Sequence, residues 1–239
     1  MRVLAIVPAF NEERSIRSVI VGLRRAAPAV DVCVIDDGST DGTGDAARAA
    51  GATLLSLPVN LGIGGAVQAG YRWARDRGYD VAVQVDGDGQ HDASFLPALV
   101  AEVASGRADL VVGSRFSGPR VEGAFRSTWS RRAGIRYLSA VLRIRCGARV
   151  LAPTSGFRAA GRRAIELFAR SYPPDYPEPE SIAVAARAGL RIAELPVRMA
   201  ERLHGESSIG LGRSLYYLVK VSMALVLLPT RLPPGEEIA

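Results

Sequence analysis

Short apolar runs alternate with polar turns along the first half of the chain, and this alternation predicts a sheet covered by helices. Runs rich in Val, Ile and Leu, typical of buried strands, occupy residues 3–7, 32–35, 52–56 and 81–85. Between the runs, apolar residues recur at the three-to-four-residue spacing of amphipathic helices. Strands of this composition are buried on both faces of a mostly parallel sheet. The pattern therefore predicts an α/β fold with a Rossmann-like, mostly parallel sheet flanked by helices.

The second half of the chain continues the pattern less regularly. Further strands are expected at 109–115 and 190–197, and helices at 93–105, 126–145, 162–168 and 180–188. A short strand or turn is expected at 154–157, and a polar loop at 198–212. Residues 171–179 contain four prolines, which predicts a stiff loop ending at Glu180, because proline removes a backbone donor from a helix.

The last apolar segment, Leu211 to Leu228, approaches the length of a membrane span, which requires roughly 20 residues. Arg213 and Lys220 interrupt it, and a charge near the middle of a span costs about 2.5 to 3.5 kcal/mol. An amphipathic helix at a membrane surface fits better, with a helix docked on the protein's own core as the alternative. We therefore expect a main domain at 1–210 and an amphipathic helix and tail at 211–239.

Two carboxylates follow the strand at 81–85 directly. Asp86 and Asp88 are two residues apart, so on an extended chain they face the same side, and Gly87 between them lets a ligand approach. Ligands of α/β sheets bind outside the carboxyl ends of the strands. Paired carboxylates suit Mg²⁺ or Mn²⁺, which completes its shell with phosphate oxygens, and Gln90 offers a further carbonyl oxygen. The sequence predicts a metal and diphosphate site, with an ordinary acidic turn as the alternative.

Composition narrows the ligands but does not choose among them. The net charge is +6, and nearly all the positive charge is arginine, which grips phosphates in a bidentate manner. Nucleic acid, an anionic membrane surface and a phosphorylated small molecule all fit this charge. Cys33 and Cys146 show neither metal-ligand spacing nor a disulfide framework, which favours a reducing cytoplasm, and no signal peptide is expected. The glycine-rich stretch 60–70 follows the third strand, whereas the glycine-rich fingerprint of a dinucleotide-binding site follows the first strand. Its position therefore disfavours a dinucleotide-binding site.

Four separated motifs together resemble those of the family 2 glycosyltransferases of the GT-A fold. In chain order they are Val7-Pro-Ala-Phe-Asn-Glu-Glu13, Val34-Ile-Asp-Asp-Gly-Ser-Thr-Asp-Gly-Thr43, Val85-Asp-Gly-Asp-Gly-Gln-His91 and Val112-Gly-Ser-Arg115. Within this family the chain is most similar to the polyprenyl-phosphate and dolichol-phosphate mannose synthases. This second likeness rests on residues 153–158, 180–197 and 202–210. The prolines at 177 and 179 and the single short hydrophobic segment at the end depart from the pattern of those synthases.

The resemblance implies a role for each matching residue. The nucleotide-sugar pocket would be lined by Pro8, Ala9, Phe10, Glu12, Asp36, Asp86, Gly87 and Asp88. The metal ligands would be Asp86, Asp88 and Gln90. The acceptor phosphate and the departing diphosphate would be surrounded by Arg115, Arg131 and Arg202, with Ser207 helping to close the site. His91 is expected to be a neighbour of the carboxylates rather than a base.

The resemblance also implies an inverting transfer of a sugar, mannose favoured, from a nucleotide-diphosphate sugar to a polyprenyl phosphate. GDP-mannose is the favoured donor and UDP-glucose the next. The phosphate oxygen of such an acceptor is already ionised, so positioning and electrostatic stabilisation suffice without a general base. We expect a peripheral enzyme at the cytoplasmic face of the membrane, with no nucleic acid partner.

Two alternatives remain at this point. One is transfer of glucose or another sugar to a saccharide hydroxyl in cell-envelope polysaccharide synthesis, with Glu178 or Glu180 as the base. The other is a nucleotide-sugar-binding or partner-docking protein without catalysis.

Overall fold

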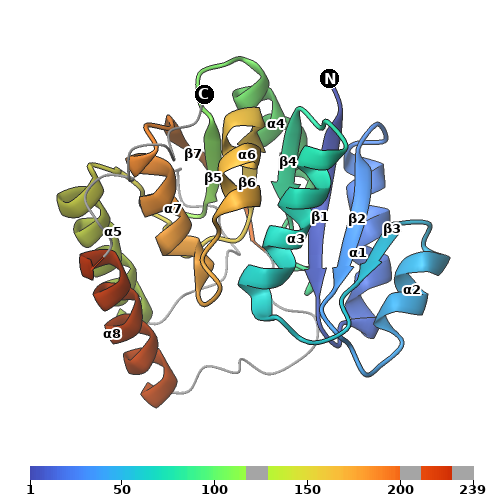
Figure 1. Ribbon diagram of the computed structural model, residues 1–239, viewed down its shortest axis with the longest axis horizontal. Helices are drawn as coiled ribbons and strands as arrows, with labels where there is room; N and C mark the ends of the chain where they lie inside the picture. Colours follow the sequence, from blue (N-terminus) through green and yellow to red (C-terminus); the bar gives the residue numbers. More distant parts are fainter. Residues whose placement is uncertain (117–128, 200–210, 228–239) are drawn as a thin grey trace.

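The computed structural model describes residues 1–116, 129–199 and 211–227 of the chain (Figure 1). Within them, a seven-stranded sheet has the order β3-β2-β1-β4-β6-β5-β7. The strands are β1 (Val3–Ala9), β2 (Asp31–Asp36), β3 (Thr53–Ser56), β4 (Val81–Gln84), β5 (Leu110–Ser114), β6 (Arg158–Gly161) and β7 (Ile192–Pro196). The helices are α1 (Glu13–Ala26), α2 (Thr43–Ala49), α3 (Gly62–Asp76), η1 (Ala93–Phe95), α4 (Leu96–Ala104), α5 (Trp129–Cys146), α6 (Arg162–Arg170), α7 (Pro177–Arg187) and α8 (Leu211–Leu227). The predicted mostly parallel α/β sheet is confirmed.

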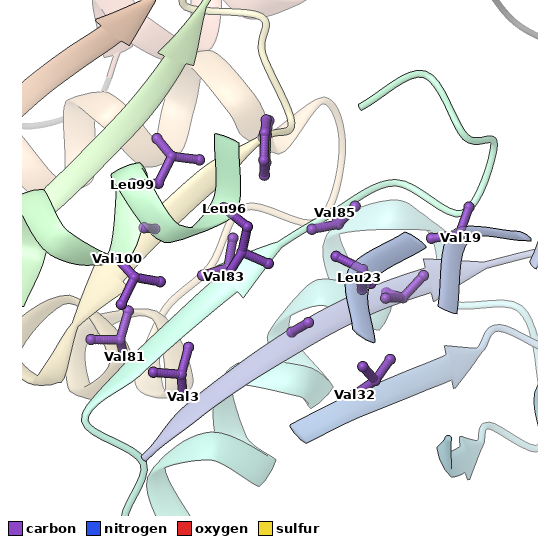
Figure 2. Packing of buried hydrophobic residues seen from close by; sticks show 14 of the residues in the cluster. Val3, Val19, Leu23, Val32, Val81, Val83, Val85, Leu96, Leu99 and Val100 are labelled. Atoms are coloured by element: carbon purple, nitrogen blue, oxygen red, sulfur yellow. The ribbon is translucent and has the colours of Figure 1, made fainter. Parts of the chain in front are cut away.

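Helices cover both faces of the sheet, and successive side chains of a strand point to opposite faces. Val81 and Val83 of β4 belong to the cluster formed with α1 and α4, whereas Ala82 belongs to the cluster formed with α3 and α6. Figure 2 shows the valines of β4 facing Leu96 and Val100 of α4. Because both faces of the strand are covered, its apolar residues occupy the successive positions 81, 82 and 83 rather than alternate ones.

Strand β6 was not predicted at its true position. It lies between β4 and β5 and runs antiparallel to both, at residues 158–161 rather than within 154–157. Its sequence, Arg-Ala-Ala-Gly, lacks the β-branched and aromatic residues that favour strands. All four of its residues are buried, so tertiary packing rather than local preference makes it a strand.

The predicted loop is confirmed for residues 171–176, but its extension to Pro179 was wrong. Helix α7 begins at Pro177, and both Pro177 and Pro179 belong to its first turn. The first backbone N–H groups of a helix have no partner within it, so prolines there remove no hydrogen bond. Tyr176, at φ 49°, turns the chain immediately before the helix. As a result, Glu178 and Glu180 stand on a regular helical turn rather than on a loop.

Helices α5, α7 and α8 lie together at the end of the sheet farthest from β3 (Figure 1). Val221 and Leu225 of α8 are buried against α5 and α7. On the outer side of α8, four large side chains are between 51% and 59% exposed, namely Tyr216, Val219, Met223 and Val226. Within the described residues, helix α8 therefore docks on the protein's core by one face and has exposed apolar side chains on the other. Among the described residues, none of the helices has the length and apolar character needed to cross a membrane.

Candidate active site

A pocket of about 510 Å³ opens at the carboxyl ends of β1 and β4. Its walls include the start of α3, with Gly62, and the start of α7, with Glu178. Several residues selected from the sequence line it: Pro8, Ala9, Phe10, Glu12, Asp86, Gly87 and Asp88. The sheet thus brings together residues from separate motifs at the edge where α/β proteins bind ligands.

His91 contacts both the backbone and the carboxylate of Asp86. The backbone N–H of Asp86 donates to Nδ1 of His91 over 3.1 Å, and Nε2 of the same ring lies 3.5 Å from Oδ2 of Asp86. Because Nδ1 accepts a hydrogen bond, the proton of the neutral ring is on Nε2 and faces the carboxylate. The ring is stacked on Phe157, with 4.9 Å between centroids, and only 4% of the side chain is exposed. His91 therefore orients Asp86 and does not line the pocket.

The turn between the two carboxylates is tightly enclosed. A Cβ on Gly156 would lie 2.7 Å from Oδ1 of Asp86, and one on Gly87 would lie 3.1 Å from the carbonyl oxygen of Pro8. Oγ of Ser15 is 2.7 Å from the carbonyl oxygen of Gly87 and 2.7 Å from Oε2 of Glu12. Glycine is needed where the backbone of the neighbouring loops approaches the carboxylates this closely.

Asp88 is almost buried, with 7% of its surface exposed. Its Oδ1 accepts a hydrogen bond from the backbone N–H of Gln90 over 3.0 Å. Gln90 does not line the pocket. It supports Asp88 through its main-chain N–H rather than through its side-chain amide. In the described part of the chain, no group of three His, Cys, Asp or Glu side chains is arranged to hold a metal ion.

At the end of β2, Asp37 rather than Asp36 reaches the pocket. Oδ1 of Asp36 accepts the backbone N–H of Ser39 over 3.0 Å, and Asp36 is not part of the lining. Asp37 lines the pocket and its Oδ1 accepts the backbone N–H of Leu61 over 2.7 Å. Burial raises the pKa of Asp37, against the lowering effect of this backbone donor. The signal for Asp37 was the glycine-rich start of α3, whose free N–H groups need an acceptor.

Of the three predicted arginines, only Arg115 has a side chain among the described residues. Arg115 follows β5 and its guanidinium carbon lies 5.3 Å from the ring centroid of Phe116, outside the pocket lining. Arg131 belongs to α5, but its side chain lies outside the described residues, as do Arg202 and Ser207. The roles of these arginines stay predictions.

The two glutamates at the start of α7 face different surroundings. Glu178 lines the pocket, and burial raises its pKa while Arg158 lowers it. Glu180 is not part of the lining. Its pKa is raised to about 7, chiefly by burial, while Lys220 of α8 lowers it and Asp175 raises it further. Only Glu178 is placed to meet a ligand of this pocket.

The raised pKa of Glu180 predicts a pH-dependent stability. Because the folded-state pKa lies above that of the unfolded chain, the favourable contribution is complete below the unfolded value and is lost as the pH rises through about 7. Between pH 5 and pH 8 the free energy of unfolding of the parent is therefore expected to fall relative to that of Glu180→Gln. The expected change is roughly 1 kcal/mol after allowance for solvent screening. Urea unfolding at both pH values measures this difference. Parallel pH dependence of the two proteins would contradict it.

Comparison with known proteins gives a consistent picture over nearly the whole chain. The pattern of glycosyl transferase family 2 matches residues 4–167. An undecaprenyl-phosphate mannosyltransferase of Micrococcus luteus is 39% identical over 222 residues, covering 89% of each chain. A polyprenol monophosphomannose synthase of Mycolicibacterium smegmatis is 31% identical over 219 residues, which are 87% of this chain and 81% of the relative.

Solved structures agree with the sequence relatives on the fold. A crystal structure of glucosyl-3-phosphoglycerate synthase from Mycobacterium tuberculosis superposes with a TM-score of 0.71 and 25% identity, over 98% of this chain and 83% of the other. Another crystal structure of that synthase contains Mn²⁺, uridine diphosphate and phosphoglyceric acid, with a TM-score of 0.66, 25% identity and coverage of 98% and 80%.

Proposed function

This chain belongs to glycosyl transferase family 2, and we propose that it transfers a hexose, mannose before glucose, from a nucleotide-diphosphate sugar to a polyprenyl phosphate. The observation that carries the proposal is the pocket that contains Asp86 and Asp88 at the carboxyl end of β4. The names of the two mannosyltransferase relatives, which match at 39% and 31% identity, support a polyprenyl phosphate as the acceptor. GDP-mannose is the first donor to test and UDP-glucose the second.

Asp86 and Asp88 would hold Mg²⁺ or Mn²⁺ against the diphosphate of the donor. Both are hard oxygen ligands, and these ions keep positions for phosphate oxygens when one or two carboxylates bind them. The glycine between the carboxylates lets this turn pack against the end of β1, because a Cβ there would lie 3.1 Å from the carbonyl oxygen of Pro8. When bound, the ion neutralises charge that develops on the departing diphosphate. The side chain of Gln90 as a third ligand remains part of the proposal.

The residues of the pocket would bind and orient the donor. Pro8, Ala9, Phe10, Glu12 and Asp37 form the wall that we assign to the nucleoside. Arg115, Arg131 and Arg202 are proposed to bring the acceptor phosphate beside the diphosphate, which is a task of charge placement. An oxygen of the acceptor phosphate then forms a bond to the anomeric carbon as the bond to the diphosphate breaks. This in-line displacement inverts the anomeric configuration and needs no proton acceptor.

Helix α8 is proposed to rest on the cytoplasmic face of the membrane that contains the acceptor. Its uncovered face carries Val219, which is 51% exposed, beside Met223 at 57%. Burying such a side chain in the interface stabilises binding by about 1.5 kcal/mol, and a charge there opposes it.

Val219→Glu is therefore expected to weaken sedimentation with vesicles that contain anionic lipids by about tenfold or more. The matched control is Val21→Glu on α1, because Val21 is 48% exposed but lies on a helix at the other end of the sheet. Equal binding of the two variants would contradict a membrane role for α8.

Release of the nucleotide tests the function as a whole. The full chain is incubated with Mg²⁺ or Mn²⁺ and either GDP-mannose or UDP-glucose, with and without polyprenyl phosphate. The proposal predicts that one donor releases its nucleotide much faster when the lipid is present. Release that responds to an added saccharide but not to the lipid would favour the alternative acceptor.

A further inference from the structure

Glu178 is a carboxylate in the donor pocket that the transfer described above does not use. It lines the same cavity as Asp86 and Asp88, and its side chain is partly exposed there. In the described residues these carboxylates do not form a three-ligand metal group. A carboxylate that faces a pocket accepts hydrogen bonds only, and it is costly to leave without donors once a ligand excludes water.

The helical turn that carries Glu178 is held by a buried arginine. Arg158 is 1% exposed, and its Nη1 donates to Oγ of Ser181 over 2.6 Å. Oγ of Ser181 in turn donates to the carbonyl oxygen of Glu178 over 3.1 Å. Nε and Nη2 of Arg158 donate to the carbonyl oxygens of Ser155 and Pro153, at 2.6 and 3.0 Å. The same side chain thus ties the start of α7 to the loop that contacts Asp86.

The pKa of Glu178 is raised, because burial outweighs the charge of Arg158, which lowers it. The charge of Asp86 also raises this pKa. The arginine therefore supplies an opposite charge behind a carboxylate that shares its pocket with two others.

The loop before α7 fixes this turn against the opposite wall. A Cβ on Gly64, in the first turn of α3, would lie 2.2 Å from the carbonyl oxygen of Pro173 and 2.3 Å from that of Pro174. The start of α3 thus packs closely against the backbone of the loop that leads into α7. A side chain on a rigid element of this kind can recognise the position of a ligand group.

We propose that Glu178 accepts hydrogen bonds from hydroxyl groups of the donor's sugar and so determines which sugar the enzyme transfers. The inference rests on the proposed function, because it takes a nucleotide-diphosphate sugar as the ligand. With the metal and Asp86 and Asp88 at the diphosphate, the sugar is the part of the donor that carries hydrogen-bond donors next to them. Arg158 and Ser181 position the carboxylate for this contact.

Binding of donors to the full chain, measured by calorimetry with Mg²⁺ present, tests the proposal. The probes are GDP-mannose, its monodeoxy analogues and GDP, with UDP-glucose, its deoxy analogues and UDP as the second series. Glu178→Ala and Glu178→Gln are expected to bind the sugar nucleotide about tenfold to a hundredfold more weakly than the parent, with binding of the nucleoside diphosphate unchanged. At least one deoxy analogue should bind the parent more weakly than the intact sugar nucleotide does. The two variants should bind that analogue and the intact sugar nucleotide equally well.

Glu180→Gln is the matched control, since Glu180 belongs to the same helical turn and lies outside the pocket lining. It is expected to bind all probes like the parent. Equal weakening of GDP and GDP-mannose in Glu178→Ala would show a structural role and overturn the proposal. So would unchanged donor binding with slower transfer, which indicates a base, or a parent that tolerates every deoxy analogue. If sugar recognition depends on Glu178 but polyprenyl phosphate accepts no sugar, only the proposed acceptor is wrong.

Discussion

Asp88→Ala is expected to lower sugar transfer roughly a hundredfold to a thousandfold while leaving the protein folded. Asp88 lines the pocket with only 7% of its surface exposed, and its Oδ1 already accepts the backbone N–H of Gln90. Loss of the carboxylate removes half of the proposed metal site, so the diphosphate loses both its position and its counter-charge. Initial rates of sugar transfer over a range of Mg²⁺ and Mn²⁺ concentrations measure the effect.

Asp92→Ala is the matched control for this substitution. Asp92 follows in the same loop, but its carboxylate caps η1 through the backbone N–H of Ser94 and pairs with Arg198 at 3.4 Å. Its loss should change transfer only a few-fold. An Asp88→Ala protein with full transfer activity would contradict the metal role of this turn.

Arg158→Met is expected to destabilise the fold by about 3 kcal/mol or more. The guanidinium is buried, and its removal leaves the carbonyl oxygens of Pro153 and Ser155 and the hydroxyl of Ser181 without their donors. It also removes the positive charge that favours ionised Glu178. Urea unfolding at neutral pH gives the free energy of unfolding.

Arg162→Met provides the comparison, because Arg162 pairs with Asp80 at the surface and its side chain is 71% exposed. A surface ion pair of this kind contributes about 1 kcal/mol or less. Equal unfolding midpoints for the two variants would contradict the role assigned to the buried arginine. Arg158→Lys, which keeps the charge but not the three directed donors, should fall between Arg158→Met and the parent.

The carboxylate turn could be found from the sequence because its signal is local. A Val-rich run followed by Asp86 and Asp88 fixes both the strand and the edge of the sheet at which the side chains emerge. The same reasoning was wrong at the start of α7, where prolines were interpreted as a loop. Whether a proline belongs to a loop or to a first helical turn depends on what packs around it, which the local sequence does not contain.

Long-range contacts explain the other differences. Strand β6 has no local strand preference and forms because β4 and β5 flank it. Asp37 was missed in favour of Asp36 because the choice depends on which carboxylate faces the start of α3. The central position of Arg158 could not be predicted either, since it bonds to a loop and to a helix that only the fold brings together.

Identification of the product tests the central claim most directly. The full chain is incubated with Mg²⁺, polyprenyl phosphate and GDP-mannose carrying a labelled sugar, and the chloroform-soluble material is examined by mass spectrometry. We predict a labelled lipid whose mass equals polyprenyl phosphate plus one hexose residue, with the anomeric configuration opposite to that of the donor. The same experiment with UDP-glucose identifies the donor if GDP-mannose gives no product. Label that remains in the aqueous phase with both donors, as free sugar or attached to a saccharide, would contradict the account.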